Sequence, residues 1–230
     1  MKEASVQIRF KENPALLDKA LQDIQKHLLS KLPWLNYAFG RAHRFVDYMP
    51  DGNKNIYPGT YIGNGEYVSL LPNDNFGNFS WFDIYDPQRV IQTTFPQSFL
   101  SFSGAVIFWY DLSSIYEDST LLYTEEIKSE ILKVLTSPGI LTSGRLTITE
   151  FSERFDNIYK DYSIEKIYNK YAYKGEGMQD LDKQFFMYPY AALRVEFSIT
   201  QRDNLAVGSS LLPGGGSGSS DGSGGTLKFC

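Results

Sequence analysis

The sequence predicts an α+β fold in which a mainly antiparallel sheet is flanked by two or three helices. Three observations carry this prediction. An amphipathic helical pattern lies near the amino end, a segment of alternating apolar and polar residues lies around residue 195, and turn signals divide much of the chain between them into short β-rich pieces. Helices that precede and interrupt antiparallel strands are typical of the α+β class.

The first predicted element is a helix that Pro14 opens and that ends near Pro33. Proline is well tolerated in the first turn of a helix, where its missing N–H would have no partner. The apolar residues of this segment recur at spacings of four, three and four: Leu17, Leu21, Ile24 and Leu28. This spacing places them on one face of a helix, so the segment is predicted to be amphipathic.

The stretch after this helix is rich in strand-forming residues and is broken by turn signals. We expect strands near residues 37–48, 57–62, 66–71 and 79–85. Asn64 and Gly65 lie between the second and third of these segments. An Asn-Gly pair suits a tight hairpin turn, because both residues adopt positive φ at low cost.

Residues 98–110 begin with alternating serine and aromatic residues and become wholly apolar, which predicts a central strand. A second helix is predicted from Thr124, which caps it, to Pro138, which stops it. Its apolar positions are Ile127, Ile131 and either Val134 or Leu135. A strand is then expected over residues 145–151.

The segment after that strand predicts a helical stretch from its apolar and aromatic residues, which are Phe155, Ile158, Tyr159 and Tyr162. The clearest strand of the chain covers residues 191–200. One of its faces is apolar, with Ala191, Leu193, Val195, Phe197 and Ile199. The other face has Ala192, Arg194, Glu196, Ser198 and Thr200 and is predicted to contact solvent. We expect the apolar face to be buried beneath one of the two main helices.

We expect residues 1–205 to form a single domain with a β-rich insertion at about 49–97, followed by an arm at 206–230. Within the arm, residues 214–225 are only Gly, Ser and one Asp, which bury no apolar surface. Leu227 and Phe229 follow this tract. We interpret the arm as a tether whose apolar tip contacts a neighbouring subunit or partner; the alternative is a solvated tail or an expression remnant.

Composition excludes some function classes and favours others. The formal net charge is −5 and no Lys/Arg cluster is present, which argues against a dedicated nucleic-acid binder. The aromatic fraction of 15% is high and suggests contact surface. One cysteine, at position 230, allows no disulfide within the chain. The chain shows no signal peptide and no membrane-spanning run, so we expect a cytoplasmic protein.

Catalytic and metal-binding motifs are not evident. His27 lies beside the apolar stripe of the first helix, and His43 has no second His or Cys at metal-ligand spacing. The acids Asp74, Asp83 and Asp86 match no calcium loop and are expected to be solvated. We therefore expect no catalytic, cofactor or metal site, and a protein that is not an enzyme. The neighbouring aromatic residues are expected to line an interface or to stack on sugars: Trp81, Phe82 and Tyr85.

The order of these elements resembles the tail-terminator and head–tail connector proteins of tailed bacteriophages. The likeness covers most of residues 1–205 and includes the helix EEIKSEILKVLTS and the final strand MYPYAALRVEFSITQ. Tyr188, Pro189 and Tyr190, before an Arg-containing last strand, look most like proteins of crAss-like phages that infect Bacteroidetes. The Gly/Ser tract has no counterpart in this likeness.

The resemblance implies a tail-terminator-like fold and a structural virion protein without catalysis. It implies a ring of identical copies in the phage neck, in contact with portal-side and tail-side proteins. DNA would pass through the ring without specific binding, no membrane would be involved, and assembly would occur in the host cytoplasm. Two alternatives remain open: a carbohydrate-binding or tail-fibre-associated module that uses the aromatic loop 76–85, and a hydrolase whose site the sequence does not reveal.

Overall fold

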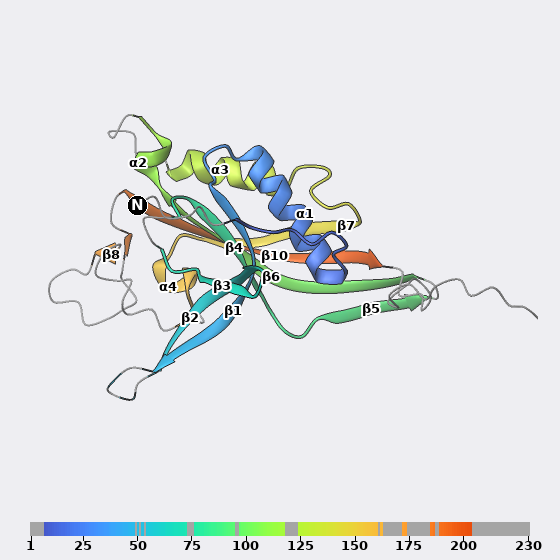
Figure 1. The fold of residues 1–230 in the computed structure, drawn as a ribbon. Helices are drawn as coiled ribbons and strands as arrows, with labels where there is room; N and C mark the ends of the chain where they lie inside the picture. Colours follow the sequence, from blue (N-terminus) through green and yellow to red (C-terminus); the bar gives the residue numbers. More distant parts are fainter. Residues whose placement is uncertain are drawn as a thin grey trace, which may run out of the picture.

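The computed structural model describes residues 7–48, 50, 52, 54–72, 76–94, 97–117, 124–160, 162, 172–173, 185–186 and 189–203. Its centre is an eight-stranded sheet in the order β3-β2-β1-β4-β6-β10-β7, in which β5 pairs with β6 (Figure 1). All described pairings are antiparallel except that of β1 with β4. The structure is therefore a mixed α+β fold with a mostly antiparallel sheet, as predicted.

The elements have the following bounds. The strands of the large sheet are β1 Tyr37–Tyr48, β2 Lys54–Gly63, β3 Glu66–Ser69, β4 Phe79–Ile84, β5 Arg89–Thr94, β6 Gln97–Asp111, β7 Gly144–Ser152 and β10 Tyr190–Asp203. A separate two-stranded sheet pairs β8 Ala172–Tyr173 with β9 Phe185–Phe186. The helices are α1 Leu16–Lys31, α2 Leu112–Ile115, α3 Thr124–Leu135 and α4 Phe155–Ile158.

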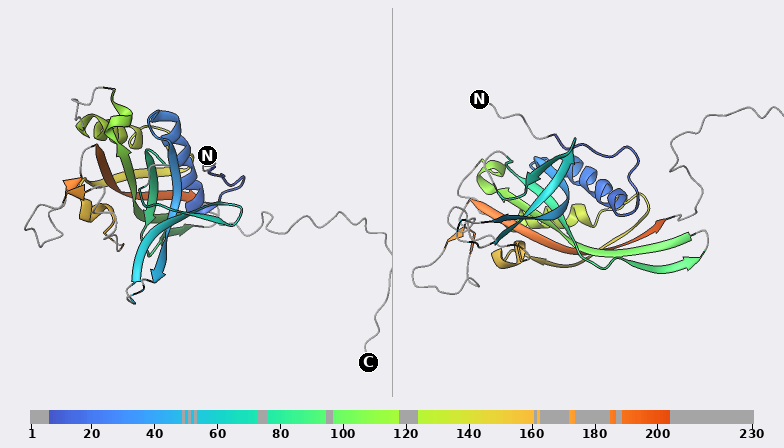
Figure 2. Two further views of the ribbon diagram at one scale, coloured as in Figure 1. Left: turned by 60° about the vertical axis from the view of Figure 1, so that its left-hand side comes forward. Right: turned by 60° about the horizontal axis from the view of Figure 1, so that its bottom comes forward.

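The two longer helices lie together on one face of the sheet (Figures 1 and 2). α1 contributes Leu17, Leu21, Ile24 and Leu28 to the core beneath it, which confirms its predicted amphipathic pattern. α3 contributes Ile127, Ile131 and Leu135 to the same core. None of the helices among the described residues is both long enough and apolar enough to cross a membrane.

The long strands β6 and β10 form the middle of the sheet. They pair from Tyr190 opposite Asp111 to Asp203 opposite Ser98, so nearly the whole of each strand is bonded to the other. β4 lies on the other side of β6, which confirms the prediction of a central strand there. The stretch at about 49–97 contributes β2, β3, β4 and β5, and all four pair within this same sheet.

The hairpin between β2 and β3 has the turn that its sequence predicts. Asn64 has φ of 54° and Gly65 has φ of 79°, so both central residues adopt the left-handed conformation of a two-residue turn. Arg9 donates a hydrogen bond of 2.8 Å to the Asn64 side chain. This turn fixes the register that places Tyr61 opposite Tyr67.

Both faces of β10 are covered over part of its length, which corrects one prediction. Leu193, Val195 and Phe197 lie in the core under α1 and α3, as expected. On the opposite face, however, Ala192 and Arg194 are each only 1% exposed. A second core covers them, because α4 and the chain around Leu70 and Phe76 pack against that face. Further along this face Glu196 and Ser198 are half-buried, and Thr200 is exposed.

Two further predictions differ from the structure. The helical segment after β7 is a single turn, α4, rather than a longer helix, although Ile158 and Tyr159 are buried as its apolar pattern suggested. The edge strand β5 was not predicted. It pairs with the first part of β6, which begins three residues after β5 ends, so the two strands form a hairpin.

Candidate functional site

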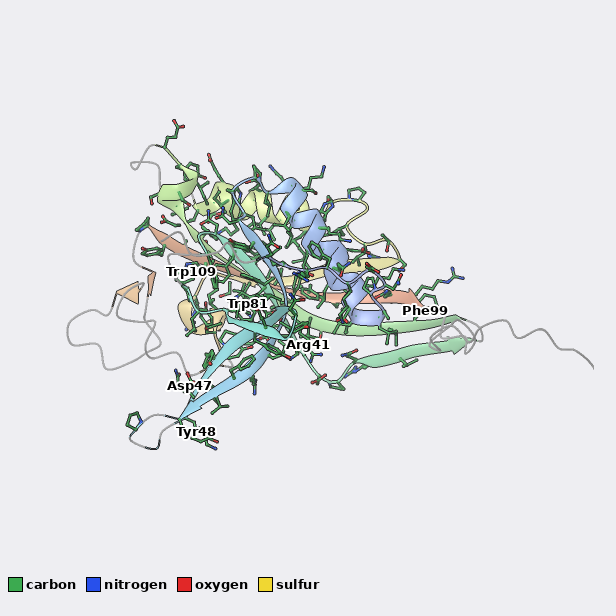
Figure 3. All side chains as sticks on the ribbon, in the orientation of Figure 1. Arg41, Asp47, Tyr48, Trp81, Phe99 and Trp109 are labelled. Carbon is green, nitrogen blue, oxygen red and sulfur yellow. The ribbon has the colours of Figure 1, made fainter. Side chains whose placement is uncertain are left out.

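Two of the residues predicted to form an interface lie in the interior. Trp81 and Phe82 are both 0% exposed, and because they are neighbours on β4 they point into opposite cores. Figure 3 shows Trp81 within the body of the molecule. Each ring is packed against residues of its own chain, so neither forms a contact surface. The prediction for these two residues is corrected, because alternation in a strand covered on both faces buries every position.

The same correction applies to the aromatic loop 76–85 as a sugar-binding surface. Phe76 is 6% exposed, and Phe79 is fully buried with it. Their rings pack edge to face at a centroid distance of 5.6 Å. These two rings are part of the second core, so neither offers a face on which a sugar can stack.

Tyr85 belongs to a buried polar cluster rather than to an interface. Its hydroxyl donates to both carboxylate oxygens of Glu196, at 2.7 and 2.6 Å, and accepts from the Arg194 guanidinium. Arg194 also donates to Glu196 at 2.8 Å and to Asp83 at 3.2 Å. Lys160 donates to Glu196 at 3.1 Å. The cluster joins α4, β4 and β10 by charge-assisted hydrogen bonds.

The contacts within this cluster favour the ionised form of Glu196 and the neutral form of Tyr85. Burial raises the pKa of Glu196, but hydrogen bonds from Arg194 and Tyr85 outweigh burial and hold that pKa below its ordinary value. Burial raises the pKa of Tyr85, and the hydrogen bond to Glu196 raises it further. Tyr85 is therefore a neutral donor at physiological pH, and Glu196 is an anion that accepts from its neighbours.

A cavity of about 90 Å³ lies beside the cluster. It is lined by Glu150, Ser152, Asn157, Lys160, Arg194 and Glu196. Pockets for drug-sized ligands measure roughly 300–1,000 Å³, so this cavity has room for a few water molecules and not for such a ligand. Arg194 and Glu196 already satisfy one another. The cluster is therefore built to hold α4 on the sheet.

A shallow open pocket of about 260 Å³ between α1 and the loop before β7 contains His27. Its Nε2 lies 2.7 Å from the Ser137 hydroxyl, which resembles a serine–histidine pair. The Ser137 hydroxyl, however, donates to the Val134 carbonyl at 2.7 Å, so the histidine is the donor and not the base. The contact ties α1 to the end of α3. Among the described residues, no group of three or more His, Cys, Asp or Glu side chains is placed to hold a metal ion.

An exposed aromatic surface lies on the ribbon of β1, β2 and β3, in which the outer ends of β1 and β2 project from the body away from α1 and α3 (Figures 1 and 2). We call it the aromatic face; its residues are His43, Phe45, Tyr57, Tyr61 and Tyr67. Their rings form a continuous layer with centroid distances of 5.2 to 6.5 Å. Tyr67 is 57% exposed and Tyr61 is 46% exposed. The chain thus presents a broad aromatic surface to solvent.

Gly59 allows this layer to lie flat on the strands. A Cβ atom at Gly59 would lie 2.6 Å from two ring carbons of Phe45, so only glycine leaves room for that ring. The opposite face of the ribbon also exposes apolar residues, since Tyr48 is 73% exposed and Val46 is 43% exposed. Figure 3 shows Tyr48 and Asp47 at the outer end of the ribbon. Apolar residues exposed on both faces of a projecting ribbon are typical of a protein interface.

The opposite end of the sheet, at β7, has an open strand edge instead of an aromatic layer. β7 pairs with β10 on one side, and no strand among those described covers its other side. Phe151 on β7 is 48% exposed, and Lys128 lies over its ring at 5.7 Å. An open strand edge presents a row of backbone donors and acceptors to any partner strand. The sequence alone indicated neither end of the sheet as a contact surface.

The remaining predicted interface residues, Leu227 and Phe229, lie outside the residues that the structure describes. The residues of the aromatic face were present in the sequence as alternating aromatic positions, but only the pairing of three strands brings them together.

In comparisons with known proteins, no family model matches the chain and no curated protein matches it. Because neither comparison gives a match, function is inferred from three features of the structure: the aromatic face, the open edge of β7 and the buried polar cluster.

Proposed function

We propose that this chain is a structural subunit of a ring in the neck of a tailed bacteriophage, between portal-side and tail-side proteins. The observation that carries the proposal is that one sheet has two unlike contact surfaces, the aromatic face at one end and the open edge of β7 at the other. A ring of identical subunits needs two different surfaces on each subunit, because every interface joins one kind to the other.

The resemblance in element order to tail-terminator and connector proteins supports a location of the ring in a virion. The net charge of −5 agrees with a wall past which DNA slides without being held. The two cavities described above are consistent with a structural role. One is small and its polar groups are paired to one another, and in the other the serine hydroxyl donates to a backbone carbonyl. The buried polar cluster contributes rigidity to the subunit rather than chemistry.

Electron microscopy of the purified full chain, with light scattering at increasing concentration, tests the proposal. We expect closed rings, alone or on addition of a portal-side or tail-side protein. In virions that contain the chain, gold attached to Cys230 should lie at the neck. A chain that stays monomeric with such partners, or gold found only on fibres, would contradict the proposal.

A matched pair of variants connects the ring to the aromatic face. Tyr67→Ser removes the most exposed ring of that face and should lower the ring population at least tenfold, because exposed tyrosines at interfaces contribute strongly to binding. Glu66→Ser changes the adjacent exposed residue on the same strand and should leave the ring population unchanged. Equal populations for the two variants would remove the aromatic face from the interface.

Carbohydrate binding is a second candidate, now at the aromatic face instead of loop 76–85. The observation that favours it is the flat layer of exposed rings above Gly59, a surface on which sugar rings can stack. A glycan array separates the two functions. The ring proposal expects no glycan to bind, whereas glycan binding that Tyr67→Ser abolishes would favour the second candidate.

A further inference from the structure

The open edge of β7 has the properties of an acceptor for an added strand. β7 extends over Gly144–Ser152 and is bonded only to β10 among the described strands. Among the described residues the outer backbone groups of β7 have no strand partner, so they can bond to another extended segment on either side of the bulge that interrupts its pairing with β10. Proteins commonly bind peptides by adding them as a strand to such an edge, with side-chain pockets providing specificity.

The two faces of β7 differ in polarity. On the side of α1 and α3, Leu146 and Ile148 are only partly buried at the margin of the core, and Phe151 is 48% exposed. On the other side, Arg145, Thr147 and Glu150 are exposed. The pairing with β10 confirms this division, because Ile148 lies opposite Phe197 whereas Glu150 lies opposite Glu196. A strand that complements this edge is apolar on the helix side and polar on the other.

Residues 226–230 have this pattern. In an extended strand Leu227 and Phe229 share one face, and Thr226, Lys228 and Cys230 share the other. With Leu227 and Phe229 on the helix side, they would continue the half-covered row of Leu146, Ile148 and Phe151. Lys228 would then lie on the face that carries Arg145 and Glu150, where it can pair with the exposed Glu150 carboxylate.

The length of chain before this segment indicates which copy it reaches. β10 ends at Asp203, and Gln201 is already paired with Gly144, so the edge of β7 in the same chain starts about 10 Å away, two strand spacings. Residues 204–225 can span about 70 Å when extended. A free Gly-rich coil of that length averages about 26 Å end to end. This reach exceeds what the edge in the same chain requires and suits the edge of an adjacent copy.

We infer that residues 226–230 of one copy add as a strand to the edge of β7 in the next copy. This inference rests on the proposed ring, and it names one of the contacts that close it. Backbone hydrogen bonds to β7 hold the segment, and Leu227 and Phe229 complete the margin of the core. The Gly/Ser tract before the segment crosses from one subunit to the next.

The single cysteine of the chain, Cys230, provides a direct test. Neighbouring residues on paired strands lie about 4.5–5.5 Å apart between Cα atoms, within the range for a disulfide. Cysteine is introduced singly at Arg145, Thr147 or Glu150, which share the face expected for Cys230. Two further variants are controls. Leu146→Cys lies on the other face of the same strand, and Gln88→Cys lies at an exposed position between β4 and β5. Oxidised samples of the full chain are separated on non-reducing gels.

We expect disulfide-linked chains from at least one of the three polar-face positions, at ten or more times the yield of Leu146→Cys and Gln88→Cys. Adding Leu227→Ser and Phe229→Ser should lower that yield at least tenfold. Equal yields at all five positions indicate random encounters and overturn the inference. A disulfide formed only within one chain, shown by mixing chains with two different tags, or no disulfide at all, also overturns it.

Electron microscopy of the Leu227→Ser and Phe229→Ser double variant separates this inference from the proposed function. Closed rings of the double variant would mean that the ring forms without this contact. Closed rings of the parent, together with no cross-link from any of the three polar-face positions, would mean that the ring stands and the strand addition falls. Specific cross-links between chains that never close into rings would mean the opposite.

Discussion

Arg194 shows how one residue can be misassigned by its pattern. The alternating pattern of β10 places Arg194 on the face that is predicted to contact solvent. In the structure, however, Arg194 is 1% exposed and lies among Asp83, Tyr85 and Glu196. A buried arginine is stable only when its charge is paired and its donors are used. Arg194 meets this condition, because it also donates to the Ile158 carbonyl at 3.3 Å and thereby holds α4.

Replacing Arg194 with methionine should destabilise the fold by about 3–5 kcal/mol, because it removes the buried guanidinium that pairs with the carboxylates of Asp83 and Glu196. Methionine keeps much of the apolar volume of the side chain. Denaturant unfolding followed by circular dichroism measures the change. Arg202→Met, an exposed position on the same strand, is the control and should stay within about 0.5 kcal/mol of the parent. Equal unfolding midpoints for the two variants would contradict a structural role for the cluster.

Glu196 makes stability depend on acidity. Its pKa in the folded chain is lowered, since hydrogen bonds from Arg194 and Tyr85 outweigh burial. In the unfolded chain a glutamate has a pKa of about 4.3. A lowered folded pKa adds stability that is fully present above the unfolded value and is lost as pH falls through the folded value. The free energy of unfolding should therefore fall between about pH 5 and pH 3.

Glu196→Gln tests this origin of the acid sensitivity. The variant lacks the titrating carboxyl, so its free energy of unfolding should change less with pH across the same interval than that of the parent. Glu66→Gln, an exposed glutamate on β3, should keep the parent's slope. If both variants kept the parent's slope, other carboxyl groups would be responsible.

At the scale of elements, β4 and β6 approach so closely that one position requires glycine. A Cβ atom at Gly104 on β6 would lie 2.4 Å from the Asp83 carbonyl oxygen and 3.0 Å from the Ile84 side chain. At Gly40 on β1, the nearest atom would lie 3.7 Å away, an ordinary contact. Neither glycine has a positive φ, so the difference between them is one of space.

Gly104→Ala should therefore destabilise the fold by about 1–3 kcal/mol, the usual cost of overpacking. Gly40→Ala should be neutral or stabilising by up to about 1 kcal/mol, because alanine loses less backbone entropy than glycine on folding. Thermal unfolding of both variants checks this. A Gly104→Ala variant as stable as Gly40→Ala would mean that β4 and β6 are not in this register.

At the scale of the whole molecule, charge sets the response to DNA. The net charge is −5, and no Lys/Arg cluster is present in the sequence. Duplex binding should be weaker than submicromolar at physiological salt and independent of sequence, because affinity for DNA comes mainly from neutralised phosphates. Fluorescence anisotropy with two labelled duplexes of unrelated sequence measures this. A submicromolar complex that prefers one duplex would contradict a passive channel wall.

Local patterns were sufficient to predict most individual elements. The spacing of Leu17, Leu21, Ile24 and Leu28 predicted α1, and Asn64 with Gly65 predicted the hairpin, because these signals depend on neighbours a few residues away. The alternation in β10 predicted the strand and the burial of its apolar face. The edge strand β5 was missed. Its residues are strand-forming, but the segment is short, and its pairing with the adjacent β6 is seen only in the structure.

The sequence by itself therefore determined the α+β class, the main helices and the long strands, because the period of apolar residues fixes local geometry. The tertiary structure alone decided which faces are covered. Burial of Trp81, Phe82 and Arg194 and exposure of Tyr61 and Tyr67 depend on what packs over each strand. Alternation reveals that a strand has two faces, but the neighbours that cover a face come from distant parts of the chain. Contact surfaces are decided at that level, because a surface is whatever the fold leaves uncovered.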